Sequence, residues 1–341
     1  MEFNEKAEID TSQVEDATGG SSGGGGGGGF QFPGGASFPG ADSGGGSGGG
    51  GLGSVLGGKG GLFGGGIVGL LIICLLGFLG VGGNLGGMGG ILDSGGTTSG
   101  QNVDNSDLQS KCAVSNPDRF KDVKCRNTLF VNSIQNYWRG GLQANFGRAY
   151  QLAPTQFFSG SVNTACGSAS SGVGPFYCPG DKKVYIDLTF YDELAKRFGA
   201  PGQFAQAYVL AHEYGHHVQN LLGTEAQMRR AQQRDPGNAN QYSVMLELQA
   251  DCYAGVWAKA ATATTDQSGN AIFKSVTQQD ISEALTAAAA VGDDAIQKKA
   301  TGSINKDSWT HGSSVQRQQW FGKGFETGDP KQCNTFGNAL G

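Results

Sequence analysis

The spacing of apolar residues predicts a mainly helical C-terminal part of the chain. Phe130, Ile134 and Trp138 recur at helical spacing, and Gly140 follows them as a stop. Similar patterns recur further along the chain. The helices expected from this spacing cover residues 127–139, 204–222, 241–260 and 277–291, and a further one begins at Ser313.

Shorter apolar runs among glycine and serine turns predict strands at Phe157, 175–178 and 184–188. The run 184–188 comes shortly before the helix at 204–222, so we expect an edge strand on which an extended peptide can lie. Several helices with a small sheet make an α+β domain, and we expect one domain over 111–341.

The first hundred residues are dominated by glycine and hold most of the 62 glycines. Such a sequence buries too little apolar surface to offset its chain entropy, so we expect 1–65 to be a disordered acidic segment. We expect 66–92, with the apolar core IVGLLIICLLGFLGV, to be a single transmembrane helix, and 93–110 to be a linker. A buried core helix is the alternative for the apolar run.

The flanking charges predict how such a helix would be oriented. Lys59 precedes the apolar run and Lys111 is the nearest basic residue after it, which favours a cytoplasmic N-terminus and an extracytoplasmic catalytic domain. We therefore expect a single-pass protein of the cell membrane. A cleaved signal peptide fits less well, because the run begins far from Met1 and follows an acidic segment.

The net charge is −5, with no stripe of lysine or arginine, so no nucleic-acid partner is expected. The glycine runs also lack the lysine that ends a phosphate-binding loop, and a flexible tether is the better interpretation.

Candidate chemistry is concentrated in an H-E-x-x-H sequence formed by His212, Glu213 and His216. Two histidines four residues apart lie on one face of a helix and can bind one metal ion, while Glu213 can act on a water molecule. A glycine inside an ordinary helix costs about 1 kcal/mol of stability relative to alanine. We therefore expect another backbone to pack closely at Gly215. His217 points away from this face, and we interpret it as a polar helix-face residue.

A catalytic zinc needs a third protein ligand. The helix at 241–260 contains Glu247 and Asp251 one turn apart, so Glu247 can face the metal while Asp251 accepts a hydrogen bond from a ligand histidine. We favour His212 as that partner. The alternative, a solvated acidic stripe, is opposed by apolar neighbours such as Val244 and Leu248.

His311 is the last histidine, and it precedes a helix start marked by Ser313 and Gln316 in capping-box spacing. We hypothesise that His311 supplies a hydrogen bond to the oxyanion of the transition state. Arg317 would order the site or bind a substrate carboxylate. Each can instead be a surface polar group, and His311 can alternatively replace Glu247 as the zinc ligand.

Cysteine usage suits an oxidising compartment, because six cysteines follow Cys74 of the apolar run. Proximity suggests two pairs and leaves a third, with free buried thiols as the alternative. The pairs are Cys112 with Cys125, Cys166 with Cys178, and Cys252 with Cys333.

Three segments carry a family resemblance: AYVLAHEYGHHVQNLLG, ELQADCYAGVWA and HGSSVQRQQWF. Together they resemble the putative neutral zinc metallopeptidase family, which comprises membrane-anchored bacterial proteins related to the gluzincins. The resemblance covers residues 112–325 and implies a zincin-like α+β fold. It also implies one zinc ion at His212, His216 and Glu247, with Glu213 as catalytic acid and base.

These observations predict a membrane-anchored zinc endopeptidase acting on peptides or proteins. In such an enzyme zinc activates water and Glu213 transfers its proton. A zinc amidase acting on cell-wall peptides is a second possibility, because it needs the same site chemistry. A non-catalytic module held together by zinc is a third, and it would require four protein ligands.

Overall fold

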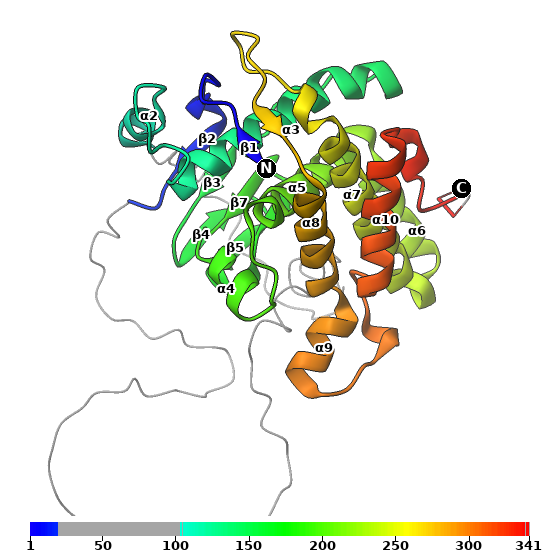
Figure 1. Cartoon of the computed structure of the whole chain (residues 1–341). Coiled ribbons are helices and arrows are strands. Elements are labelled where there is room, and N and C mark those ends of the chain that lie inside the picture. Colours follow the sequence, from blue (N-terminus) through cyan, green and yellow to red (C-terminus); the bar gives the residue numbers. More distant parts are fainter. Residues whose placement is uncertain (20–102, 104, 338, 341) are drawn as a thin grey trace, which may run out of the picture. The chain divides into compact units, whose positions relative to one another are not determined.

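Helix α5, Gln203–Leu222, is the central element of the fold in a computed structural model that describes residues 1–19, 103, 105–337 and 339–340 (Figure 1). Most of its residues are buried, because it packs against the helices α3 (Val123–Phe146), α7 (Ala239–Ala260) and α8 (Gln278–Ala290) and the strands β6 (Phe176–Cys178) and β7 (Lys183–Ile186). At its first turn, Glu283 of α8 accepts a hydrogen bond from the Phe204 amide, at 3.1 Å. Gly223 ends it in the left-handed conformation (φ 78°).

The helices expected from the sequence are present, with shifted ends. The bounds are α2 Ser106–Cys112, α3 Val123–Phe146, α4 Phe190–Lys196, α6 Thr224–Arg234, α7 Ala239–Ala260, α8 Gln278–Ala290, α9 Asp293–Thr301 and α10 Ser314–Thr327. The predicted stop at Gly140 is wrong, since α3 continues to Gly147 and buries Leu142. Residues 106–110 of the predicted linker belong to α2.

A four-stranded sheet lies beside α5, and its order is β2-β3-β7-β6. The strands are β2 Val14–Asp16, β3 Thr155–Phe157, β7 Lys183–Ile186 and β6 Phe176–Cys178. Pairing is parallel except between β6 and β7. The expectation of an edge strand at 184–188 is wrong, because β7 lies between β3 and β6, and the edge strands are β2 and β6.

Two further pairs of strands complete the described sheets. Strand β1, Glu2–Phe3, pairs with β8, Phe273–Ser275, and β4, Ser161–Thr164, pairs with β5, Gly167–Ser170. Helices with small sheets agree with an α+β architecture. Residues 1–18, in contrast, depart from the predicted disorder.

The first eighteen residues are an ordered part of the folded domain, which corrects the prediction of disorder there. Strand β2 extends the main sheet, and Lys124 pairs with Asp16 and Lys183 with Glu15, each at 2.7 Å. Val14 is fully buried. Charged residues and a few apolar ones thus give residues 1–18 enough contacts to fold onto the domain, whereas the rest of the predicted disordered segment lies outside the described residues.

This packing overturns the predicted single-pass topology. Residues 1–18 pair with strands of the C-terminal domain in one compact unit, so a single span cannot place them on opposite sides of a membrane. The predicted transmembrane helix at 66–92 lies outside the described residues, and no helix within them is sufficiently long and apolar to span a bilayer. The transmembrane helix and the cell-membrane localisation are therefore not retained.

Three disulfides join the cysteine pairs that proximity had suggested. They connect Cys112 to Cys125, Cys166 to Cys178 and Cys252 to Cys333. The last one ties α7 to the segment after α10. The contact between α7 and α10 is also close, because a Cβ on Gly255 would lie 2.0 Å from the Phe321 carbonyl oxygen.

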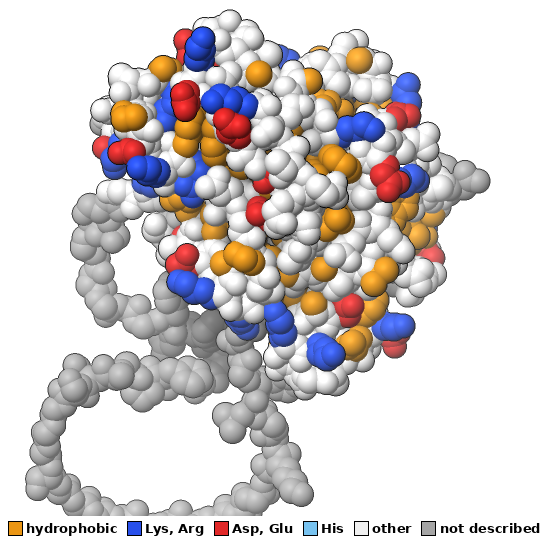
Figure 2. All heavy atoms as spheres, in the orientation of Figure 1, with side chains coloured by type: hydrophobic (Ala, Val, Ile, Leu, Met, Phe, Trp, Pro, Cys, Tyr) orange, Lys and Arg blue, Asp and Glu red, His pale blue; other side chains and the backbone are white. Residues whose placement is uncertain are grey.

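Acidic and basic side chains lie near one another over much of the face shown in Figure 2, with a group of basic ones in its lower part. Ion pairs within single helical turns include Lys111 with Asp107 and Lys196 with Asp192. Such exposed pairs add little stability.

Candidate metal centre

Two helices bring three metal-ligating side chains together. His212 and His216 of α5 and Glu247 of α7 each offer one ligand atom, and these atoms lie within 4.8 Å of one another. His212 Nε2 is 3.2 Å from His216 Nε2 and 3.1 Å from Glu247 Oε2. All three residues come from the predicted ligand set, and they form the one such group within the described part of the chain.

Gly215 permits the close approach of α7 to α5. A Cβ at this position would lie 2.9 Å from both the Cα and the carbonyl oxygen of Ala250, closer than real Cβ atoms come. The expectation of a closely packed backbone at Gly215 is therefore confirmed. Ala250 stands between Glu247 and Asp251, so the same contact places both carboxylates against the H-E-x-x-H turn.

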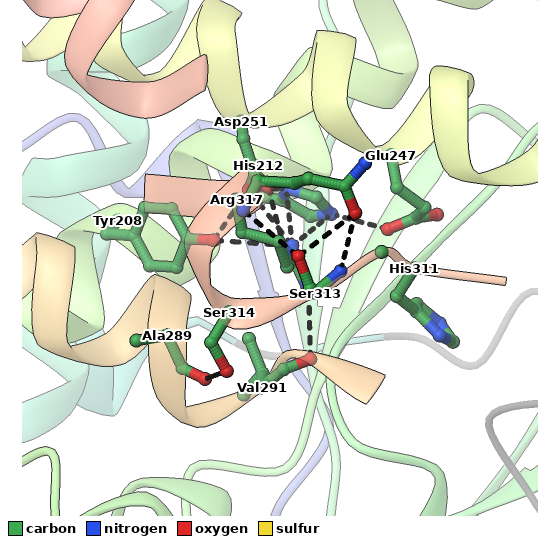
Figure 3. A network of polar contacts seen from close by, with 12 residues as sticks. Tyr208, His212, Glu247, Asp251, Ala289, Val291, His311, Ser313, Ser314 and Arg317 are labelled. Atoms are coloured by element: carbon green, nitrogen blue, oxygen red, sulfur yellow. Dashed lines mark hydrogen bonds and ion pairs between the residues drawn. The ribbon is translucent and has the colours of Figure 1, made fainter. Parts of the chain in front are cut away.

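His212 is supported by a buried ionic network (Figure 3). Its Nδ1 donates to Asp251 Oδ1 at 2.8 Å, which turns Nε2 toward His216 and Glu247. Asp251 also accepts from the Tyr208 hydroxyl at 2.6 Å and from Arg317 Nε at 2.8 Å. Asp251 thus has the position expected for it, beside His212.

Arg317 is a buried member of this network and holds Asp251 in place. Its side chain is 3% exposed, its guanidinium makes two bonds to Asp251, and Nη1 donates to the Val291 carbonyl at 3.2 Å. Of its two expected roles, the structure favours ordering the site over binding a substrate carboxylate.

Charge within the network shifts the pKa values of its members. Burial raises the pKa of Asp251, but Arg317 and His212 outweigh this effect and lower it to about 2. Burial lowers the pKa of His212, but Asp251 and Glu247 outweigh it and raise the value to about 10 in the metal-free site. Because a ligand imidazole must lose its Nε2 proton, metal and proton compete for this nitrogen.

His216 is supported by neutral amides instead. Its Nδ1 donates to Gln219 Oε1 at 2.8 Å, and the Gln219 amide nitrogen donates to the Leu246 carbonyl at 2.7 Å. Gln219 also donates to Gln249, whose own amide nitrogen donates to the Cys333 carbonyl. The sequence analysis missed Gln219, although its position three residues after His216 on one helical face was an available signal.

The donor set fits zinc. The Nδ1 atom of each histidine is bonded outward, so the two Nε2 atoms and the Glu247 carboxylate converge. Donor atoms of a tetrahedral zinc with bonds of about 2.0–2.1 Å lie about 3.3 Å apart. The two Nε2 atoms are 3.2 Å apart and each lies 3.1 to 3.3 Å from a different oxygen of Glu247, which is close to this geometry.

Glu213 stands beside the three candidate ligands and is not one of them. It is 9% exposed and lines the same cavity as His212 and His216. Burial raises the pKa of its carboxyl, although both histidines act in the opposite direction. A carboxyl group with a raised pKa, next to a metal site, is suited to accept and return a proton.

His311 lines the cavity but does not belong to the metal-ligating group, which argues against it as a replacement for Glu247. Asp293, at the start of α9, fixes its position. Asp293 Oδ2 accepts hydrogen bonds from the three consecutive amides of Thr310, His311 and Gly312, and Oδ1 lies 3.1 Å from His311 Nδ1. No sequence signal links Asp293 to His311, because eighteen residues and a loop separate them.

His217 points away from the metal, as expected, but it is buried rather than on a polar face. Its Nε2 donates to the Gln151 carbonyl at 2.7 Å, and its Nδ1 accepts from the Tyr177 hydroxyl at 3.0 Å. Asn220 donates to the same hydroxyl. These contacts tie the edge strand β6 to helix α5.

A cavity of about 240 Å³ opens at the metal site. One wall is the segment 164–179, and others come from α4, α6 and α9. Apolar side chains such as Val209, Met228 and Leu246 line it beside the candidate ligands. The site therefore adjoins a space that can hold part of a substrate.

Two histidines and a glutamate form one of the donor sets of catalytic zinc sites, and the H-E-x-x-H motif defines the class of zinc peptidases. The chain belongs to the family described as putative neutral zinc metallopeptidase, which matches residues 39–336. This confirms the resemblance drawn from the sequence.

Curated relatives match most of the chain. The chain is 46% identical over 256 residues to the uncharacterized protein Rv2575 of Mycobacterium tuberculosis, covering 73% of this chain and 84% of the relative. It is 41% identical over 277 residues to the uncharacterized protein YpfJ of Escherichia coli, covering 81% and 88%. No solved structure matches the chain.

Proposed function

We propose that this protein is a zinc-dependent endopeptidase that hydrolyses peptide bonds in a cleft between α5, α7 and the segment 164–179. One observation carries the proposal: one ligand atom from each of His212, His216 and Glu247 lies within 4.8 Å of the others, beside a buried, non-ligating glutamate in a cavity. Membership of a zinc metallopeptidase family supports it.

His212, His216 and Glu247 would hold the metal. When bound, zinc would supply Lewis-acid chemistry, polarising a peptide carbonyl and making water nucleophilic near neutral pH. Asp251 and Gln219 hold the Nδ1 proton of each histidine, so Nε2 of both rings would be the ligand atom, and metal binding would displace the Nε2 proton of His212.

Glu213 would move the proton. Its carboxylate takes a proton from the attacking water and returns it to the departing amine, which is why its raised pKa suits the reaction. His311 would assist at the developing oxyanion. Since Asp293 holds its Nδ1 proton, Nε2 can donate only when the ring carries a second proton.

A purely structural zinc site fits less well. Structural sites have four protein ligands, whereas catalytic sites have three and one open position. The described residues supply three candidates, and a cavity lies beside them. We therefore favour catalysis over a module held together by zinc.

The test compares Glu213→Gln with Glu193→Gln in the full chain, loaded with zinc and incubated with a peptide library read by mass spectrometry. Glu193 lines the same cavity but is exposed and has no assigned role. Glu213→Gln is expected to keep one zinc and lose about 10²-fold or more in kcat. Glu193→Gln should keep its activity. Equal activity in both variants, or hydrolysis by neither the variants nor the parent protein, would refute the proposal.

A further inference from the structure

One wall of the cleft, the β4–β5 hairpin, is a separate two-stranded sheet. The hairpin of β4 and β5 lines the same cavity as His212, Glu213 and His216, through residues that include Thr164, Gly167 and Ala169. Nothing else in the described cavity wall is a separate two-stranded sheet. What fixes this hairpin in place therefore fixes the width of the cleft.

The hairpin has little stability of its own. An isolated two-stranded hairpin is marginal in water, and this one consists of small and polar residues. Ala169 is the one buried residue in its two strands. Within the two strands Val162 packs onto an apolar cluster of Phe158, Cys178 and Tyr185, and Cys166 of the turn packs onto the same cluster.

Covalent and polar contacts hold the hairpin from its two ends. At its turn, Cys166 forms a disulfide with Cys178, and Asp181 accepts a hydrogen bond from the Ala165 amide at 3.0 Å. At its base, Asp187 accepts a hydrogen bond from the Gly160 amide at 3.2 Å. The disulfide is the covalent contact at the turn, and Cys166 itself lines the cavity.

The disulfide also connects the hairpin to the metal helix. Cys178 ends strand β6, and the preceding residue, Tyr177, bonds through its hydroxyl to His217 and Asn220 of α5. A short path therefore runs from the hairpin turn through the disulfide and β6 to the helix that carries the metal ligands.

We propose that the Cys166–Cys178 disulfide is a positioning element that holds the β4–β5 hairpin as the wall of the substrate cleft. It acts on substrate binding and leaves the metal and Glu213 unchanged. Without it the hairpin moves away from the cleft. The substrate then loses contacts that it makes equally in the ground state and in the transition state. This inference rests on the proposed function, because it assigns the cavity to a peptide substrate.

The chain offers a matched control for the experiment. The Cys112–Cys125 disulfide spans 13 residues and the Cys166–Cys178 disulfide spans 12, so loop entropy alone predicts similar losses of stability when either is removed. The first pair joins α2 to α3, and neither cysteine lines the cavity. A difference in substrate kinetics between the two variants therefore reports position and not stability.

The variants Cys166→Ser/Cys178→Ser and Cys112→Ser/Cys125→Ser are made in the full chain and loaded with zinc. Both are expected to bind one zinc and to unfold at similarly lowered temperatures. The cleft variant should raise KM for a cleaved peptide about fivefold or more with kcat changed less than about twofold, and the control should leave KM unchanged. Equal KM values in the two variants would overturn the proposal.

Two additions keep the outcome decisive. If the serine at the buried position 178 prevents folding, Cys166→Ala/Cys178→Val tests the same link with an apolar replacement. Hydrogen exchange provides a readout without turnover: amides of 161–170 should exchange faster in the cleft variant only, and equal exchange in both would overturn the proposal. Absence of hydrolysis in the zinc-loaded parent protein would instead refute the endopeptidase function, and exchange alone would then decide the role of the disulfide.

Discussion

The two candidate ligand histidines are supported in different ways. Around His212, Asp251 and Arg317 form a charged network that is almost entirely buried, whereas His216 relies on the neutral amide of Gln219. Both arrangements fix the Nδ1 proton and present Nε2 to the metal. They differ in what remains when a partner is lost: an uncompensated buried charge in the first case, and an unpaired polar group in the second.

The difference follows from where each ring lies. The His212 side chain is 9% exposed and its partner Asp251 is fully buried, so charge there must be neutralised within the protein. The His216 side chain is 17% exposed and lies nearer the cavity, where a neutral acceptor is sufficient. The prediction that follows is that the His212 network is the more sensitive of the two.

Replacing Asp251 should have the largest effect. Asp251→Asn leaves the Arg317 guanidinium buried without its counter-charge, so we expect a loss of about 3–5 kcal/mol in the free energy of unfolding. Zinc binding should weaken about 10–100-fold. Urea unfolding and zinc competition with a chelator measure the two quantities.

A double variant sharpens this prediction. Asp251→Asn combined with Arg317→Met removes both charges and should recover part of the lost stability, because no uncompensated charge remains. If Asp251→Asn alone costs less than about 1 kcal/mol, the ionic network is not what distinguishes His212 from His216.

His217 is buried and makes hydrogen bonds to neutral groups only, so its contribution to stability should fall at acidic pH. Burial lowers its pKa to about 4, so between pH 6.5 and 4 the unfolded chain binds a proton that the folded one does not. Stability from this residue is complete above pH 6.5 and falls as the pH drops, by about 3 kcal/mol at most. The free energy of unfolding of His217→Gln should lack this slope, and an unchanged slope would show that His217 is not held neutral.

The smallest effect is expected at Gln219, the neutral hydrogen-bond partner of His216. Gln219→Ala should cost about 1–2 kcal/mol of stability and weaken zinc binding about tenfold, at the lower end for such partners. Gln219→Glu retains an acceptor for the His216 Nδ1 proton and should bind zinc more tightly than the alanine variant. Zinc affinity lost equally in Gln219→Ala and Asp251→Asn would remove the distinction between the two supports.

Local periodicity made much of the site predictable. His212 and His216 are one helical turn apart, as are Glu247 and Asp251, so each pair could be assigned to one face before the helices were placed together. The distance between the two helices could be anticipated at Gly215, where a missing side chain signals a close contact.

Features that depend on tertiary pairing could not be derived in this way. Asp293 reaches His311 through a loop, and β7 is interior because residues 176–178 pair with it, which no spacing reveals. Residues 1–18 were misjudged because glycine elsewhere in the first hundred residues dominated the composition. Their own apolar and acidic side chains find partners far along the chain, such as Lys124 and Lys183.

Anomalous diffraction from zinc-loaded crystals tests the central claim most directly. We expect one zinc ion about 2.0–2.2 Å from His212 Nε2, His216 Nε2 and a Glu247 carboxylate oxygen, with one remaining position not taken by protein. A zinc bound by a fourth protein side chain, or an ion placed away from Glu247, would contradict the account.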